Sequence, residues 1–205
     1  MSNLFPHFPV FLDLAGRSVV LLGGDDAHAV LARQLLAVGA SVSVFSATPS
    51  QAMRALAPPV RLKLRRWRSA DFAGARLVIA DLSETRPHRA QIAAHGVGAV
   101  FHQLGAPEQS DVALGGVAAR GALSVGVSLP AAPAALARAV QVRLELALPA
   151  GLSDFLEAAH RLRTEVENRF PNPEARDRFW TALGQAAFDA PPDSDWDAFV
   201  AARLP

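Results

Sequence analysis

An apolar run, a pair of glycines, an amphipathic segment and a second apolar run follow one another near the start of the sequence, and this order most limits the possible folds. Residues 17–22 (RSVVLL) are nearly all apolar, as in a parallel strand that is buried on both faces. Gly23 and Gly24 end this run, and residues 26–38 then carry apolar side chains at helical spacing. Residues 41–45 are again apolar, so the segment predicts a strand–turn–helix–strand unit.

The alternation of strands and helices continues as far as residue 103. Residues 60–68 alternate apolar and basic side chains, as a half-exposed strand does, and residues 76–80 form another buried run. Residues 87–95 predict a helix that begins with proline, and residues 97–103 predict a fifth strand. We therefore expect an α/β fold with a Rossmann-like, doubly wound parallel sheet.

The pattern changes in the second half of the chain. Residues 111–117 and 122–128 predict a β-hairpin, and residues 133–148 predict a long amphipathic helix. Two further helices are expected over residues 152–170 and 173–188. The predicted parts are a nucleotide-binding-like domain over residues 1–110, a hairpin-and-helix region over residues 111–150 and a small all-α domain over residues 151–205.

Composition excludes several classes of site and partner. The net charge of +1 on 205 residues argues against a nucleic-acid partner. The chain has no cysteine, which excludes thiol catalysis, thiolate metal sites and disulfides, and makes the cytoplasm the expected location. No window approaches the roughly 20 apolar residues that a membrane span requires, so no membrane contact is expected.

Three stretches in order resemble the N-terminal module of the siroheme-synthase family, the NAD-dependent precorrin-2 dehydrogenases and sirohydrochlorin ferrochelatases. The first is FPVFLDLAGRSVVLLGG with ARQLLAVGASVSVFSAT, the second is Gly105-Ala106-Pro107, and the third is PAALARAVQVRLELALP with LRTEVENRF and RDRFW. The resemblance implies a Rossmann domain that holds NAD, a hairpin-helix region that forms a homodimer, and a helical C-terminal domain. It also implies oxidation of precorrin-2, a tetrapyrrole, to sirohydrochlorin, with iron insertion in some members.

The glycine turn departs from the family pattern Gly-x-Gly-x-x-Ala. Gly23 fits the first position, but Asp25 stands at the second glycine and His28 at the third position. A carboxylate there repels a diphosphate by about 4 kcal/mol at a separation of about 4 Å and an effective dielectric constant of about 20. Alternatively, Asp25 and Asp26 serve to cap the helix. The candidate cofactor-binding residues are Gly23, Gly24, Asp25, Asp26, Ala27, Ala47 and Thr48.

The family's catalytic aspartate, which precedes an Ala-Pro pair, is replaced here by Gly105. Glycine cannot transfer a proton, so other residues would have to act as general base. The candidates are Asp111, Ser128 and His102, although Asp111 could instead be a solvated carboxylate at the start of the hairpin. After Ser128, residues 129–132 (LPAA) replace the family's polar loop and make the expected cleft more apolar.

Three histidines are expected at the carboxyl edge of the sheet, where ligands bind in open α/β folds. They are His28, His88 and His102. Imidazole binds metals and ligates tetrapyrrole iron, so the three predict a site for a metal, for iron or for a metallated tetrapyrrole. The alternative is that each is a separate surface or capping histidine.

Three hypotheses on function stay open. The resemblance implies an NAD-dependent precorrin-2 dehydrogenase, with or without chelatase activity. The replaced residues instead favour an NAD-independent protein that binds a tetrapyrrole or a metal, as a chelatase, a carrier or a partner subunit. A purely structural, dimerising protein would need the cleft to be empty.

Overall fold

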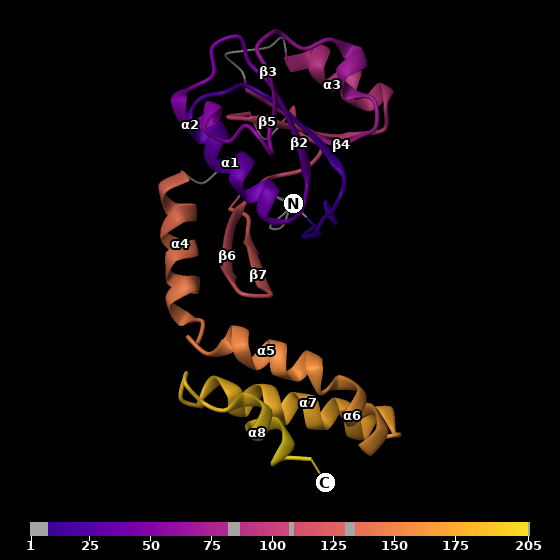
Figure 1. The fold of residues 1–205 in the computed structure, drawn as a ribbon, viewed down its shortest axis with the longest axis vertical. Coiled ribbons are helices and arrows are strands. Elements are labelled where there is room, and N and C mark those ends of the chain that lie inside the picture. Colours follow the sequence, from indigo (N-terminus) through magenta and orange to yellow (C-terminus); the bar gives the residue numbers. More distant parts are fainter. Residues whose placement is uncertain (1–7, 82–86, 107–108, 130–133, 205) are drawn as a thin grey trace, which may run out of the picture. The chain divides into compact units, whose positions relative to one another are not determined.

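The first half of the chain forms one five-stranded sheet in which all strands are parallel (Figure 1). The computed structural model describes residues 8–81, 87–106, 109–129 and 134–204. The strands are β1 (Ser18–Leu22), β2 (Ser41–Phe45), β3 (Arg61–Lys63), β4 (Ala75–Asp81) and β5 (Val100–Leu104). Their order is β3-β2-β1-β4-β5, so the predicted Rossmann-like sheet is confirmed.

Helices cover both faces of this sheet because successive strand residues point to opposite sides. Val19 and Leu21 lie on the face covered by α1 (Asp26–Ala37) and α2 (Gln51–Arg54). Val20 and Leu22 lie on the other face, where α3 (Pro87–Gly96) and the 3-10 helix η1 (Ser69–Phe72) pack. All four side chains are almost completely buried, as the nearly uniform apolar run predicts.

Strand β3 ends earlier than predicted, at Lys63 instead of residue 68. Nη1 and Nη2 of the Arg65 guanidinium group each donate to the carboxylate of Asp71 at 2.8 Å, and Asp71 also accepts from the backbone N–H of Arg68 at 2.7 Å. These bonds fold the segment after Lys63 back on itself. The first part of the basic alternation therefore lies in a strand, and the part after Lys63 does not. The local pattern could not predict this end, because it does not show the ion pair between Arg65 and Asp71.

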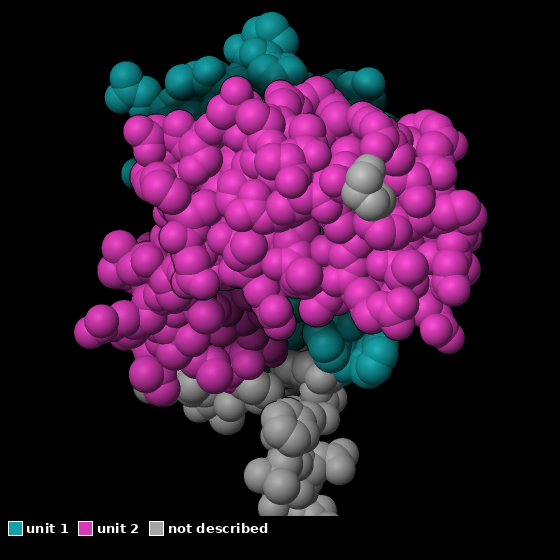
Figure 2. Space-filling view, turned by 90° about the horizontal axis from the view of Figure 1, so that it is seen from below, with its two compact units in different colours: residues 1–114 teal, residues 115–205 magenta. Residues whose placement is uncertain are grey.

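The chain divides into two compact units, residues 1–114 and residues 115–205 (Figure 2). The second unit begins with an antiparallel hairpin of β6 (Gly116–Arg120) and β7 (Leu123–Val127). Helix α4 (Ala134–Ala147) packs on β6, where Gln141 donates to the carbonyl of Val117 at 2.7 Å. The separate helical domain predicted from residue 151 onward stays a prediction.

The hairpin begins later than predicted, because the residues before it pair with β5. Asp111 donates its backbone N–H to the carbonyl of Phe101 at 2.9 Å, and its carboxylate accepts from the N–H of Phe101 at 2.8 Å. The hydroxyl of Ser110 likewise accepts from the N–H of Gln103. Residues 110–111 therefore cover the edge of the parallel sheet.

Besides α4, the described part of the second unit contains four helices, three of which contribute to one apolar cluster that includes Phe155, Leu183 and Trp196. They are α5 (Leu152–Arg161), α6 (Arg163–Arg169), α7 (Pro173–Phe188) and α8 (Trp196–Ala201). The single helix predicted over residues 152–170 is broken at Leu162, whose ψ of 1° departs from the α-helical value. None of the helices in the described ranges has both the length and the apolar character needed to cross a lipid bilayer.

Candidate functional site

The turn between β1 and α1 is built from two glycines that lie against their neighbours. Gly23 has a φ of 135°, and a Cβ at this position would overlap the imidazole ring of His28. A Cβ on Gly24 would lie 2.7 Å from the side chain of Ser46, which follows β2. Both positions therefore require glycine, and the turn is held close to the carboxyl ends of β1 and β2.

Asp25 is the N-cap of α1 and is bonded to His28 through two hydrogen bonds. Its Oδ1 accepts from the backbone N–H of His28 at 2.9 Å and lies 2.7 Å from Nδ1 of the same residue. The bond from the backbone N–H, followed by the bond from the ring, lowers the pKa of the Asp25 carboxyl from its ordinary value. Asp25 is therefore a carboxylate at neutral pH, at the positive end of the helix.

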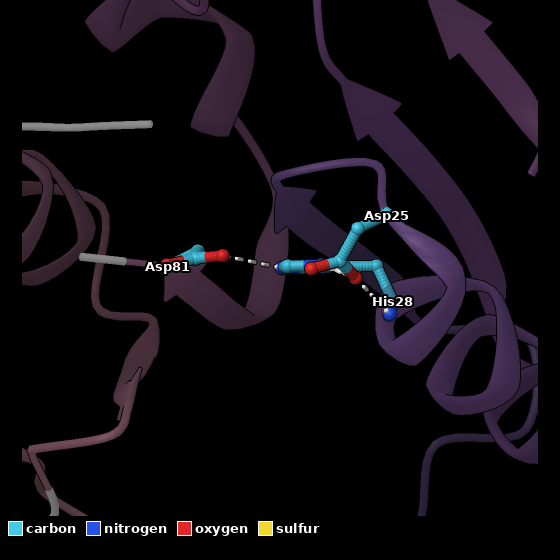
Figure 3. Close-up of side chains that lie close together, drawn as sticks. All are labelled: Asp25, His28 and Asp81. Atoms are coloured by element: carbon cyan, nitrogen blue, oxygen red, sulfur yellow. Dashed lines mark hydrogen bonds and ion pairs between the residues drawn. The ribbon is translucent and has the colours of Figure 1, made fainter. Parts of the chain in front are cut away.

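His28 lies between two carboxylates (Figure 3). Its side chain is buried, with Nε2 3.9 Å from Oδ2 of Asp81, the last residue of β4. Nε2 has no hydrogen-bond partner, although it is shielded from solvent. Among the described residues, Asp25, His28 and Asp81 are the one group of at least three potential metal ligands whose ligand atoms all lie within 4.8 Å of one another.

The remaining candidates for cofactor binding surround this group at the carboxyl edge. Asp26 is the first residue of α1, in its first turn, and is exposed, as is Ala27. Ala47 and Thr48 are exposed after the end of β2. The backbone of Ser50 donates to the carbonyl of Gly24 at 2.7 Å, which joins this loop to the glycine turn. The role of these residues in binding a cofactor stays a prediction.

His102 and His88 do not join the group around His28. His102 lies within β5 and is buried, and its Nδ1 donates to the carbonyl of Val112 at 2.8 Å. Burial lowers the pKa of His102, against the raising effect of that hydrogen bond. His88 is exposed near the start of α3. Of the three histidines predicted as metal ligands, only His28 belongs to a group of at least three potential ligands among the described residues.

Asp111, a candidate general base, lies beside the second residue of β5 and not at the carboxyl end of that strand. Its carboxylate accepts from the N–H of Phe101 and lies 2.8 Å from Nε2 of His95, near the C-terminus of α3. About 10 Å of strand separates Phe101 from the carboxyl end of β5 at Leu104. Asp111 thus joins the start of β5 to α3, and its role as a general base stays a prediction.

The other positions expected near a tetrapyrrole lie in different units. Gly105 is exposed just after β5 with a φ of 80°. Ser128 is exposed directly after β7, in the second unit, and Leu129 beside it is half-buried. Residues 130–132 of the replaced loop lie outside the described residues.

Asp81 is the site residue that the sequence analysis missed. It directly follows the buried run of β4, and the carboxyl ends of parallel strands meet at one edge. A carboxylate at that position is the signal that could have identified it. Two more buried polar atoms near this edge, Oγ of Ser46 and Oε1 of Gln103, also lack a hydrogen-bond partner.

Comparison with known proteins places the chain in a family. Residues 10–116 match the model of a family described as "Putative NAD(P)-binding", which is just over half of the 205 residues. A siroheme synthase of Chromobacterium violaceum is 32% identical over 179 residues, and one of Methylococcus capsulatus is 29% identical over 186 residues. These matches cover 86% and 88% of this chain but only 38% and 39% of the two relatives.

A solved structure supports the same fold. The chain is similar to SirC, a precorrin-2 dehydrogenase, with a TM-score of 0.74 over 96% of this chain and 98% of that chain. The sequence identity is 16%, so the similarity shows a shared architecture of the sheet, hairpin and helices.

Proposed function

The chain belongs to the NAD(P)-binding family whose model matches residues 10–116 and is related to siroheme synthases, and we propose that it binds a tetrapyrrole without using NAD at its glycine turn. The siroheme-synthase relatives and the fold shared with a precorrin-2 dehydrogenase support a tetrapyrrole as the ligand. The rest of the proposal depends on the residues that line the turn.

The observation that carries the proposal is the position of Asp25 at the N-terminus of α1. In Rossmann folds the diphosphate of a dinucleotide lies at this helix end, close to the backbone of the glycine turn. Here the carboxylate of Asp25 already accepts the N–H of His28, and the ring of His28 lies against Gly23. These residues do not fit a diphosphate, because a second anion would meet a charged carboxylate.

The size of this effect is large enough to matter. Two unit charges about 4 Å apart repel by about 4 kcal/mol at an effective dielectric constant of about 20. Salt screens part of this repulsion, since Asp25 is exposed. A loss of about two to three orders of magnitude in NAD affinity follows.

The chain also lacks the family's proton-transfer group at the end of β5. Gly105 offers no side chain, and the carboxylate of Asp111 is bonded to Phe101 and His95. Hydride transfer from precorrin-2 requires loss of a proton as well, so the missing carboxylate and the altered turn both argue against dehydrogenation. A chelatase, carrier or partner subunit needs neither NAD nor hydride transfer.

The second candidate function is the reaction that the resemblance implies, NAD-dependent oxidation of precorrin-2. The match to the NAD(P)-binding family model over residues 10–116 favours it. It would require NAD to bind despite Asp25, and a base other than the residue at position 105.

We also propose a homodimer and a cytoplasmic location. Exposed apolar side chains on the hairpin and α4, Val117, Val142 and Leu146 among them, support an interface at this region. The lack of cysteine agrees with a reducing compartment.

Absorbance titrations test the two candidate functions. Sirohydrochlorin and NAD are added separately to the purified protein, and precorrin-2 with NAD is assayed for turnover. We expect the absorbance bands of sirohydrochlorin to shift with saturation, and no turnover of precorrin-2. Turnover with NAD would establish the second candidate function, and an unchanged sirohydrochlorin spectrum would contradict tetrapyrrole binding.

A further inference from the structure

We propose that Nε2 of His28 and the carboxylate of Asp81 bind one first-row divalent cation, with Asp25 orienting the His28 ring. The cation site goes beyond the proposed function, because it requires neither a tetrapyrrole nor NAD. His28 lies in the first turn of α1, which follows β1, and Asp81 is the last residue of the neighbouring strand β4 (Figure 3).

The hydrogen bond to Asp25 fixes which ring nitrogen is available. A carboxylate only accepts hydrogen bonds, so Nδ1 of His28, 2.7 Å from Oδ1 of Asp25, carries the proton. In the neutral ring Nε2 then has a free lone pair. A carboxylate that holds one nitrogen of a metal-binding histidine is the usual arrangement around protein metal ions, since it fixes the ring and raises the basicity of the other nitrogen.

The state of Nε2 of His28 is a second, independent observation that points to a ligand. The His28 residue is only 1% exposed, and its Nε2 has no hydrogen-bond partner. A buried polar atom without a partner loses its hydrogen bonds to water and gains none in return, so such atoms are rare unless a ligand satisfies them. Nε2 faces Asp81 across 3.9 Å, which leaves a position between nitrogen and oxygen that a cation can fill.

The separation suits a transition-metal ion better than a direct hydrogen bond. Nitrogen and oxygen ligands lie about 2.0–2.2 Å from Zn²⁺, so two ligands at tetrahedral angles are about 3.4 Å apart. The 3.9 Å between Nε2 and Oδ2 therefore needs a shift of about half an ångström, which the partly exposed side chain of Asp81 can make. At 3.9 Å the two atoms are too far apart for a hydrogen bond.

The ligand types select the kind of ion. One imidazole and one carboxylate suit Zn²⁺, Co²⁺ or Fe²⁺, whereas Mg²⁺ and Ca²⁺ prefer oxygen ligands alone. Asp81 retains 24% of its side-chain exposure, so the ion has a path from solvent. With two protein ligands, further coordination positions stay open to water or to a ligand atom of a bound molecule.

The competing explanation is a proton in place of the cation. A doubly protonated His28 would interact with both carboxylates without any metal. The two cases differ in the response to added metal ions, so one set of measurements separates them.

The test uses Co²⁺ and Zn²⁺ alone, on the full chain after treatment with a chelator. We expect one equivalent of Zn²⁺ by calorimetry and Co²⁺ absorption bands of an ordered site. Asp81→Asn and His28→Gln each remove one of the two protein ligands, so each should weaken binding by more than the about 10–100-fold that loss of a partner behind a ligand costs. The matched controls are Asp13→Asn, at an exposed position before β1, and His160→Gln, at an exposed position on α5. Both should bind the metal like the unaltered protein.

A second test does not depend on the folding of any variant. Crystals of the unaltered protein are soaked in Co²⁺, and their anomalous diffraction is measured. An anomalous peak between Nε2 of His28 and Asp81 is the expected result. Absence of binding, an anomalous peak elsewhere, or equal losses in the site and control variants would overturn the cation site. Because neither sirohydrochlorin nor NAD is present, such a failure would leave the outcome of the tetrapyrrole titration unaffected.

Discussion

Asp25 holds His28 by two hydrogen bonds, one from the backbone N–H at 2.9 Å and one from Nδ1 of the ring at 2.7 Å. The pair stands at the two positions where the family pattern has a glycine and an alanine. The same two side chains thus cap α1, fill the space above Gly23 and place Nε2 opposite Asp81. Each of these three consequences can be tested separately.

The capping role predicts a moderate effect on stability. Asp25→Ala should lower the free energy of unfolding by about 1 kcal/mol, because the N–H of His28 loses its acceptor. Asp25→Ser keeps an acceptor for that N–H and should recover most of the loss. Urea unfolding measures both variants, and equal stabilities of the alanine and serine variants would show that the cap contributes little.

The contact between Gly23 and His28 predicts non-additive substitutions. Gly23→Ala should cost more than about 2 kcal/mol, because it combines a φ of 135° with overlap on the ring. In Gly23→Ala/His28→Ala the overlap is absent and only the backbone strain remains. The double variant should therefore be more stable than the sum of the single effects by about 1 kcal/mol or more. Strict additivity in unfolding measurements would contradict the contact.

The burial of His102 predicts a pH-dependent stability. Its pKa is lowered in the folded state, so the unfolded chain binds the proton more readily. The contribution is fully present above the ordinary pKa of 6.5 and is lost as the pH falls toward the lowered value. Urea unfolding between about pH 7.5 and about pH 5.5 measures this loss.

His102→Asn is the control for that titration. Asparagine can donate to the carbonyl of Val112 as Nδ1 does, but it does not titrate. The variant should lose less stability over the same pH range, while the other histidines contribute equally to both proteins. An unchanged slope would mean that His102 does not account for the pH dependence.

The sheet could be predicted from the sequence because buried parallel strands are apolar runs that local pattern displays. The end of β3 and the start of the hairpin could not be predicted in this way. The pairing of Arg65 with Asp71 and of Asp111 with Phe101 depends on side chains that meet only after folding, so strand β3 and the hairpin start were misplaced. Local pattern also gave no sign that Leu162 would interrupt a helix.

Only the part of the candidate site that is local in sequence could be predicted. Asp25 and His28 lie three residues apart, so the motif itself exposes their departure from the family pattern. Asp81 comes from another strand, more than fifty residues later, and only the sheet order places it beside His28. His88 and His102 were expected at the same edge of the sheet, but among the described residues neither joins a group of at least three potential metal ligands.

The affinity for NAD of the unaltered protein and of Asp25→Gly/His28→Ala, measured by calorimetry, tests the central claim most directly. The double variant restores the pattern Gly-x-Gly-x-x-Ala, and glycine is an acceptable N-cap, so α1 should still form. We predict weak or undetectable NAD binding by the unaltered protein and binding at least about 100-fold tighter by the variant. Equal affinities, whether both proteins bind NAD or neither does, would contradict the claim that Asp25 and His28 exclude the dinucleotide.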